Sequence, residues 1–233
     1  MLNLAVRSTE KEFMDDLDFS GQDLDESFSF IKFINLLGGG QRAVINGLKQ
    51  TLKAWPKKKP MEILDVGCGL GDIGVAISRW GTANGFTIFY YGLEQNEHIL
   101  QAARTQSGGK NIQFIQGNIF DEAIPEADLV IASMVFHHFN DQEIVKAIAH
   151  LSRKSRVALM INDLERSVSA YAICYLLTFF LQNEKSRKDA LLSVEKGFTL
   201  EEMEGLMRTA GVQGSVRKAI GCRLLAIIPT CTS

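Results

Sequence analysis

The sequence is short of cysteine and has no excess of charge of either sign. Its 233 residues include four cysteines, Cys68, Cys174, Cys222 and Cys231, and no two of them form a C-x-x-C pair. This pattern excludes a readable cysteine zinc cluster and a dense disulfide framework, and it is typical of a reduced, cytoplasmic setting. Lysine and arginine total 25 against 27 aspartate and glutamate residues, so the chain offers no positive field for a nucleic acid. We therefore predict no nucleic acid partner and no bound metal.

Long apolar runs are also missing from the sequence. The first 16 residues contain several acids and no apolar segment of the kind found in a secretory signal. The most apolar stretch, residues 169–181, is about 13 residues long, whereas a membrane-spanning helix needs roughly 20. We therefore predict no membrane span. A hydrophobic content of 46% with 22% charged residues is typical of a globular chain with a substantial core.

The chain divides at a polar turn into two predicted parts. Residues 1–60 are expected to form an N-terminal helical cap, because apolar residues recur at helical spacing over 28–37 and three glycines end that run. A second helix is expected over 42–53. Residues 61–233 form the predicted core, which contains a lid-like helical insertion at about 166–192.

Short apolar runs alternate with amphipathic segments from residue 61 onward. This alternation predicts a parallel sheet covered by helices on both faces, with ligands bound beyond the carboxyl ends of its strands. The last two strands follow one another around Gly221 and must pair antiparallel. The expected strands are 62–66, 86–93, 111–116, 129–133, 156–161, 212–218 and 223–228, and the expected core helices are 72–80, 97–106, 142–151 and 200–209.

Closely spaced glycines follow the first of these strands. In the segment Asp65-Val66-Gly67-Cys68-Gly69-Leu70-Gly71 they let the backbone turn sharply and let a ligand approach without a Cβ in the way. Such a turn can also be only a tight loop, but the strand before it and the helix after it favour a binding site. The spacing alone does not identify the nucleotide.

The same segment resembles motif I of class I S-adenosylmethionine-dependent methyltransferases, of the form E/D-x-G-x-G-x-G. It departs from the dinucleotide fingerprint G-x-G-x-x-G, which requires a glycine where this chain has Asp72. The resemblance covers about residues 25–229 and is similar to small-molecule methyltransferases of quinone or polyketide biosynthesis. It implies an α/β fold with a doubly wound, Rossmann-like, seven-stranded mixed sheet whose last strand is antiparallel. The implied cofactor is S-adenosylmethionine, and the product is S-adenosylhomocysteine.

The resemblance assigns further cofactor-binding residues to the ends of later strands. Glu94, beside Gln95, is the ribose-binding acid, and a carboxylate can accept hydrogen bonds from both ribose hydroxyls. Asn118 and Ile119 match the adenine-binding segment, although an Asx turn at Asn118 is a competing interpretation. The remaining assignments are Ser133 and Met134 beside the methionine moiety, and Arg42, which would pair with the cofactor carboxylate unless it is simply an exposed arginine.

Two histidines fall where the resemblance places the transferable methyl group. His138 is the preferred general base and His137 is the second candidate, since an imidazole titrates near neutrality and can take a proton from a hydroxyl. Packing at the cleft wall is the competing interpretation. Asn162 and Asp163 follow the fifth strand, where they either orient the substrate or cap the next helix.

The insertion is apolar on nearly all sides, including Tyr171 and Tyr175, which we predict as substrate contacts. Such an element must pack in the core, line an apolar pocket or form a subunit contact, so we also predict a homodimer contact there. The predicted reaction is methyl transfer to a small, apolar or aromatic hydroxylated metabolite, with O-methylation favoured over C-methylation. The alternatives are an NAD(P)-dependent oxidoreductase, although no Y-x-x-x-K pair occurs, and a non-catalytic cofactor-binding protein.

Overall fold

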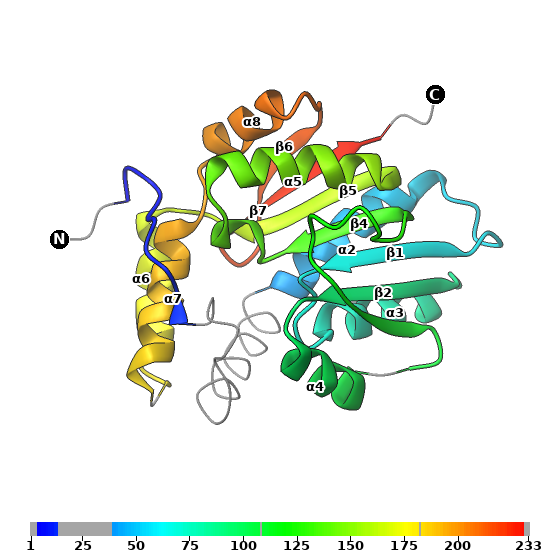
Figure 1. Ribbon diagram of the computed structural model, residues 1–233, viewed down its shortest axis with the longest axis horizontal. Coiled ribbons are helices and arrows are strands. Elements are labelled where there is room, and N and C mark those ends of the chain that lie inside the picture. Colours follow the sequence, from blue (N-terminus) through cyan, green and yellow to red (C-terminus); the bar gives the residue numbers. More distant parts are fainter. Residues whose placement is uncertain (1–3, 14–38, 108, 182, 231–233) are drawn as a thin grey trace.

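A seven-stranded mixed sheet forms the centre of the molecule (Figure 1). The computed structural model describes residues 4–13, 39–107, 109–181 and 183–230. The strand order is β3-β2-β1-β4-β5-β7-β6. The strands are β1 (Met61–Val66), β2 (Ile88–Glu94), β3 (Ile112–Gln116), β4 (Ala127–Ser133), β5 (Ser155–Leu164), β6 (Ser215–Ala219) and β7 (Arg223–Pro229).

Strand pairing confirms the predicted topology. The first five strands pair in parallel, whereas β7 runs antiparallel to both β5 and β6. Because the crossover reverses direction between β1 and β4, the carboxyl ends of these two strands border a crevice. The predicted doubly wound, Rossmann-like sheet with an antiparallel last strand is therefore correct.

Helices cover both faces of the sheet and bury two apolar clusters against it. Side chains of β1 alternate between the clusters, with Leu64 in one and Ile63 in the other, as a two-residue period requires. The first cluster includes α5 (Asp141–Arg153) and α8 (Leu200–Thr209), and the second includes α2 (Gly40–Thr51) and α3 (Asp72–Ala83). The remaining helices are η2 (Leu52–Ala54), α4 (Glu97–Ser107), η3 (Phe136–His138), α6 (Val168–Thr178) and α7 (Glu184–Lys196).

The N-terminal part differs from the predicted helical cap. Helix α2 and the short η2 match the expected helix at 42–53, whereas the apolar run at 28–37 lies outside the described residues. Residues 4–12 are irregular and run along α7, where the Ser8 backbone N–H donates to the carbonyl of Glu195 (Figure 1). We call residues 4–13 the N-terminal strap.

The predicted insertion consists of α6 and α7, which pack against each other at one end of the sheet (Figure 1). Ser167 caps α6 by accepting a hydrogen bond from the backbone N–H of Ala170. Helix α6 is too short to cross a bilayer, and none of the helices in the described ranges has the length and apolarity of a membrane span.

Candidate functional site

A cavity of about 1030 Å³ lies at the carboxyl ends of the central strands. The glycine turn after β1, the end of β2, the η3 segment and the N-terminal strap all contribute to its wall. The predicted site residues that line it are Asp65, Gly67, Cys68, Gly69, Glu94, Gln95, Ile119, Ser133, Met134, His137 and His138. The structure therefore brings most of the predicted cofactor residues and both histidines to one space, but not Arg42, Gly71 or Asn118.

The glycine turn needs glycine for conformational and for steric reasons. Gly67, Gly69 and Gly71 all have positive φ angles, of 66°, 53° and 75°. A Cβ added at Gly67 would lie 2.6 Å from Cγ2 of Val135, so a side chain there would force the cavity wall apart. Gly71 is the N-cap residue of α3, which aims the start of that helix toward the same end of the sheet.

Asp65 is a buried carboxylate beside this turn. Its Oδ2 accepts a hydrogen bond of 2.5 Å from the Tyr90 hydroxyl, while its buried Oδ1 accepts none from the residues that the structure describes. Burial, together with the nearby charges of Asp72 and Glu94, outweighs the Tyr90 bond and raises the pKa of Asp65 to about 7. An acceptor oxygen that lacks a donor is a fitting partner for a cationic ligand group.

Glu94 ends β2 and faces the glycine turn. Its carboxylate accepts backbone N–H bonds from Gly69 at 3.2 Å, Gln95 at 2.9 Å and Asn96 at 3.0 Å. Burial raises the pKa of Glu94, and these three bonds oppose that shift. Glu94 is 9% exposed, and it lines the cavity wall rather than the outer surface.

Asn118 forms the Asx turn that the sequence left open. Its Oδ1 accepts from the backbone N–H of Phe120 at 3.0 Å, and its Nδ2 donates to Oε1 of Gln95 at 3.1 Å. Ile119, the next residue, lines the cavity, whereas Asn118 does not. The structure thus presents Ile119 and Gln95 to a bound ligand on this side.

The segment after β4 has a strained backbone at the cavity wall. Met134 adopts a φ of 61°, a backbone conformation that residues other than glycine seldom adopt. Its backbone N–H donates to the carbonyl of Asn162 at 2.8 Å, and the amide of Asn162 donates to the hydroxyl of Ser133 at 2.9 Å. Asn162 therefore fixes the two residues assigned to the methionine moiety.

The position of Asn162 and Asp163 corrects the sequence prediction. Strand β5 continues to Leu164, so both side chains lie inside the strand and are fully buried. They neither lie at the open mouth of the cleft nor cap α6, whose cap is Ser167. The expected strand end at residue 161 was wrong because polar side chains can continue a strand when they are buried with hydrogen-bond partners, as both are here.

His137 and Asp163 form a buried hydrogen-bonded pair. His137 Nδ1 lies 2.7 Å from Oδ1 of Asp163, and the imidazole is 2% exposed. Burial alone would raise the pKa of Asp163, but the charge and hydrogen bond of His137, the Leu164 N–H and the charge of Arg223 lower it to about 2. Because the carboxylate is ionised, the proton of a neutral His137 belongs on Nδ1, and Nε2 is left as an acceptor.

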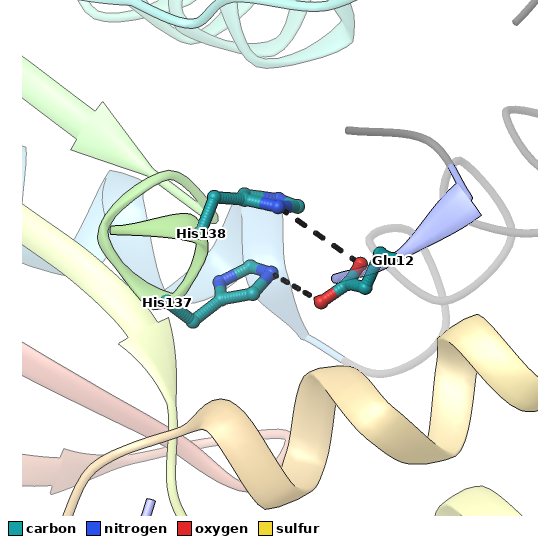
Figure 2. Close-up of side chains that lie close together, drawn as sticks. All are labelled: Glu12, His137 and His138. Atoms are coloured by element: carbon teal, nitrogen blue, oxygen red, sulfur yellow. Dashed lines mark ion pairs between the residues drawn. The ribbon is translucent and has the colours of Figure 1, made fainter. Parts of the chain in front are cut away.

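The sequence did not identify Glu12, which lies directly opposite the histidines (Figure 2). Its Oε1 is 3.9 Å from His137 Nε2, and its Oε2 is 4.0 Å from His138 Nδ1. The possible ligand atoms of Glu12, His137 and His138 lie within 4.8 Å of one another, close enough to hold a metal ion. The Lys196 ammonium, however, is 3.2 Å from Oε1 and its charge opposes a cation there, so we assign no metal.

Three further predicted residues lie away from the cavity wall, in addition to Gly71, Asn118, Asn162 and Asp163. Arg42 is exposed on α2, and Tyr175 is 47% exposed on α6. Tyr171 packs against the small cluster around Cys174, between α6 and α7. None of these three is among the residues that line the cavity, so the described structure does not bring them to the site.

Comparison with known proteins agrees with this geometry. The methyltransferase domain family matches residues 57–203. Pluviatolide O-methyltransferase of Sinopodophyllum hexandrum is 29% identical over 86 residues, which span 37% of this chain and 21% of that protein.

Two solved structures share the fold at lower identity. The plantazolicin methyltransferase BamL, in complex with a triazolic desmethylPZN analog and SAH, has a TM-score of 0.70 at 15% identity, with 91% of this chain and 92% of that chain covered. An O-methyltransferase family 2 protein from Planctomyces limnophilus, in complex with apigenin, has a TM-score of 0.59 at 18% identity, with coverages of 92% and 63%.

The family match also decides between the cofactors that such a fold can bind. It covers the glycine turn, Glu94 and both histidines, and it removes the nicotinamide-dependent oxidoreductase from consideration. Because the match spans well over half of the residues, the chain belongs to the methyltransferase domain family, within the class I S-adenosylmethionine-dependent methyltransferases.

Proposed function

We propose that this protein transfers a methyl group from S-adenosylmethionine to the hydroxyl of a small aromatic or apolar metabolite. The observation that carries the proposal is the His137–Asp163 pair, which stands in the same cavity as the glycine turn and Glu94. A base held by an ionised carboxylate suits an acceptor that must lose a proton.

The residues of the cavity fit the cofactor. The Glu94 carboxylate would hold the ribose hydroxyls, the open glycine turn leaves room for the amino acid part, and the donor-free Oδ1 of Asp65 would face a positive charge. Bound S-adenosylmethionine supplies an electrophilic methyl group on a positively charged sulfur. The chain itself contributes orientation and a base, which is what an in-line methyl transfer requires.

His137 would act as the general base. Asp163 holds Nδ1, so Nε2 can accept the proton that the acceptor hydroxyl loses while its oxygen forms the new bond to carbon. The imidazolium that results is stabilised by the carboxylate behind it. A phenol, whose pKa is about 10, needs such a base, whereas a carboxylic acid is already ionised at neutral pH.

The names of related proteins support a hydroxylated aromatic acceptor. One sequence relative is a pluviatolide O-methyltransferase, and one structural neighbour was solved with apigenin. Because the sequence match spans only a fifth of that relative, we extend to this chain only the class of acceptor and not the compound.

Radiolabelled methyl transfer tests the proposed function. The protein is incubated with S-adenosylmethionine carrying a tritiated methyl group and with matched phenols, aliphatic alcohols and carboxylic acids. We expect label in alkali-stable methyl ethers of phenols. Label only in alkali-labile esters, or only in carbon-bound methyl groups, would overturn the O-methylation proposal, and no transfer with intact cofactor binding would indicate a non-catalytic binding protein.

Lowering the pH from 7.5 to 6 is expected to weaken S-adenosylmethionine binding about tenfold. Burial raises the pKa of Asp65 to about 7, so its carboxylate gains a proton in this interval in the free protein. A cationic ligand favours the ionised carboxylate, and binding must therefore displace that proton at low pH. Isothermal titration calorimetry measures both the affinity and the proton release.

Asp65→Asn is the control for this pH dependence. The asparagine cannot ionise, so the variant should bind more weakly at pH 7.5 and should lose most of the tenfold change. An equal slope in the variant and the wild type would assign the dependence to another group, with Glu94 the next candidate because burial also raises its pKa.

We also propose a homodimer contact through α6 and the residues that follow it. Leu176, Phe179 and Phe180 are 63%, 62% and 77% exposed, a concentration of apolar side chains that the described part of the chain leaves uncovered. Core packing, one of the interpretations of the insertion, does not account for them. Light scattering should give a dimer mass for the wild type and a monomer mass for the Leu176→Glu/Phe180→Glu variant, and a wild-type monomer up to about 100 μM would contradict this contact.

A further inference from the structure

We propose that Glu12 is a positioning residue of the acceptor site, which holds His137 and His138 in place and stabilises the imidazolium that forms during transfer. The inference rests on the proposed function and adds to it a residue from outside the matched domain, since the family match begins at residue 57. The evidence for this inference is the set of contacts that the Glu12 carboxylate makes and the position in which the N-terminal strap holds that carboxylate.

The Glu12 carboxylate is buried and held from both sides. It is 3% exposed. Its Oε1 lies 3.2 Å from the Lys196 ammonium, and its Oε2 accepts a 2.9 Å hydrogen bond from the Ser193 hydroxyl. Each oxygen therefore has one anchor on α7 and one imidazole on η3, so α7 fixes the carboxylate in front of the two histidines (Figure 2).

The strap that carries Glu12 is fastened along its length. The Arg7 guanidinium donates to the carbonyls of Lys196 and Phe139 and pairs with Asp141. It also stacks over the ring of Phe198, with 4.2 Å between Cζ and the ring centroid. These contacts join the strap to α7, η3 and α5 at once. An exposed acidic side chain would not need such support, whereas a carboxylate that must keep one position does.

The charges around His137 explain what Glu12 adds. Asp163 on β5 faces Nδ1, and Glu12 on the strap faces Nε2. In the neutral imidazole Nε2 has a lone pair on this side, and after proton transfer it has an N–H that points toward the carboxylate. Glu12 therefore stabilises the product of the transfer more than its reactant, which is the requirement for a catalytic gain.

His138 benefits from the same carboxylate. The two imidazole rings lie 4.1 Å apart, so a positive charge on one disfavours a charge on the other. The charged groups that face the pair are Glu12 on the strap, Glu94 on β2 near His138, Asp163 on β5 and Lys196 on α7, with Arg223 on β7 behind Asp163. Removal of the Glu12 charge leaves Asp163 as the facing carboxylate of His137 and Lys196 as a nearby cation, so an imidazolium on either ring is less stabilised.

The variant Glu12→Gln tests this role. We expect kcat to fall about tenfold and the acid limb of the kcat/KM profile to move about one pH unit lower. The dissociation constant for S-adenosylmethionine should stay within about twofold. Glu12→Asp should recover part of kcat, and Glu204→Gln, the same exchange at an exposed position on α8, should match the wild type.

A milder variant covers the case in which Glu12→Gln does not fold. Ser193→Ala removes the anchor on Oε2 together with a bond from the same hydroxyl to the Asp189 carbonyl, and kcat should fall about threefold with only a small fall in melting temperature. An unaltered pH profile in the glutamine variant, with a lowered melting temperature, would show that Glu12 serves stability alone and would overturn the proposal.

Two further outcomes distinguish the positioning role of Glu12 from metal binding and from a failure of the proposed function. Loss of wild-type turnover on chelation, with recovery by Zn²⁺ and no response in Glu12→Gln, would assign the three side chains to a metal and overturn the positioning role. A wild type that methylates no hydroxylated acceptor would remove the proposed function, whereas full activity in both the wild type and Glu12→Gln would remove the role of Glu12 alone.

Discussion

Replacing His137 by asparagine is expected to lower kcat by about 10²- to 10³-fold while the dissociation constant for S-adenosylmethionine stays within about twofold. The asparagine amide can still donate toward Asp163, which keeps that buried carboxylate hydrogen-bonded, but it cannot take a proton. The loss should therefore appear in the chemical step and not in cofactor binding. Single-turnover kinetics with a labelled methyl group, beside calorimetry with S-adenosylhomocysteine, measures the two quantities separately.

His138→Asn is the matched control for this experiment. His138 lines the same cavity, yet its side chain is 27% exposed and its facing carboxylate is 4.0 Å away rather than 2.7 Å. We expect a fall in kcat of no more than about tenfold. If the His138 variant loses more turnover than the His137 variant, the base is His138, as the sequence alone favoured.

Asp163→Asn should give a loss close to that of His137→Asn. The amide would no longer select the imidazole form with the proton on Nδ1, so Nε2 would lose its role as an acceptor. This variant also removes a carboxylate whose pKa is lowered to about 2 in the folded state. That carboxylate stabilises the fold above pH 3.8 and loses this effect as the pH falls toward 2, so thermal melts at pH 7 must accompany the kinetics.

The sequence identified both histidines and favoured His138, whereas the structure places the buried carboxylate of Asp163 against His137. Their place after the fourth strand follows from a short local pattern. The carboxylate that distinguishes them comes from β5, 26 residues farther along the chain. The contact of Asp163 with His137 requires β5 to extend beyond residue 161. The polar pair Asn162-Asp163 gave no indication of that extension in the sequence.

The central strands were predictable because they are short apolar runs separated by amphipathic segments. Strand β4 is buried at each of its seven positions, and Leu200–Thr209 begins at a capping box of Thr199 and Glu202 that the sequence displays. These signals are local. The glycine turn is local as well, so the cofactor end of the cavity could be located without a structure.

Glu12 shows where such reasoning ends. In the sequence it is one of several acids in a polar stretch, and its partners Ser193 and Lys196 lie more than 180 residues away. Its burial depends on how the strap crosses α7, and no periodic pattern encodes that path. A side chain of this kind becomes visible only when the tertiary contacts are known.

Glu94→Ala is expected to weaken S-adenosylmethionine binding by about 100-fold. Two hydrogen bonds from ribose hydroxyls to a carboxylate are worth about 3 kcal/mol together, and each 1.4 kcal/mol corresponds to a factor of ten. The carboxylate also accepts the backbone N–H of Gly69, so its loss relaxes the glycine turn. Titration calorimetry at pH 7.5 measures the change in the dissociation constant. Glu94→Gln keeps one acceptor oxygen, so its dissociation constant should lie between those of the wild type and Glu94→Ala.

The free protein should tolerate this substitution, and that separates binding from folding. Burial raises the pKa of Glu94 in the folded protein above its value in the unfolded chain. As the pH rises from the unfolded pKa to the folded pKa, the ionised carboxylate therefore opposes folding increasingly. A neutral residue removes this cost at pH 7.5 and offsets part of the loss of the three backbone N–H bonds, so the melting temperature should fall only slightly. Glu97→Ala, at an exposed acid on α4 paired with Arg104, should leave both affinity and stability unchanged. If Glu94→Ala instead unfolds the protein at unchanged affinity per folded molecule, Glu94 supports the turn and does not bind the ribose.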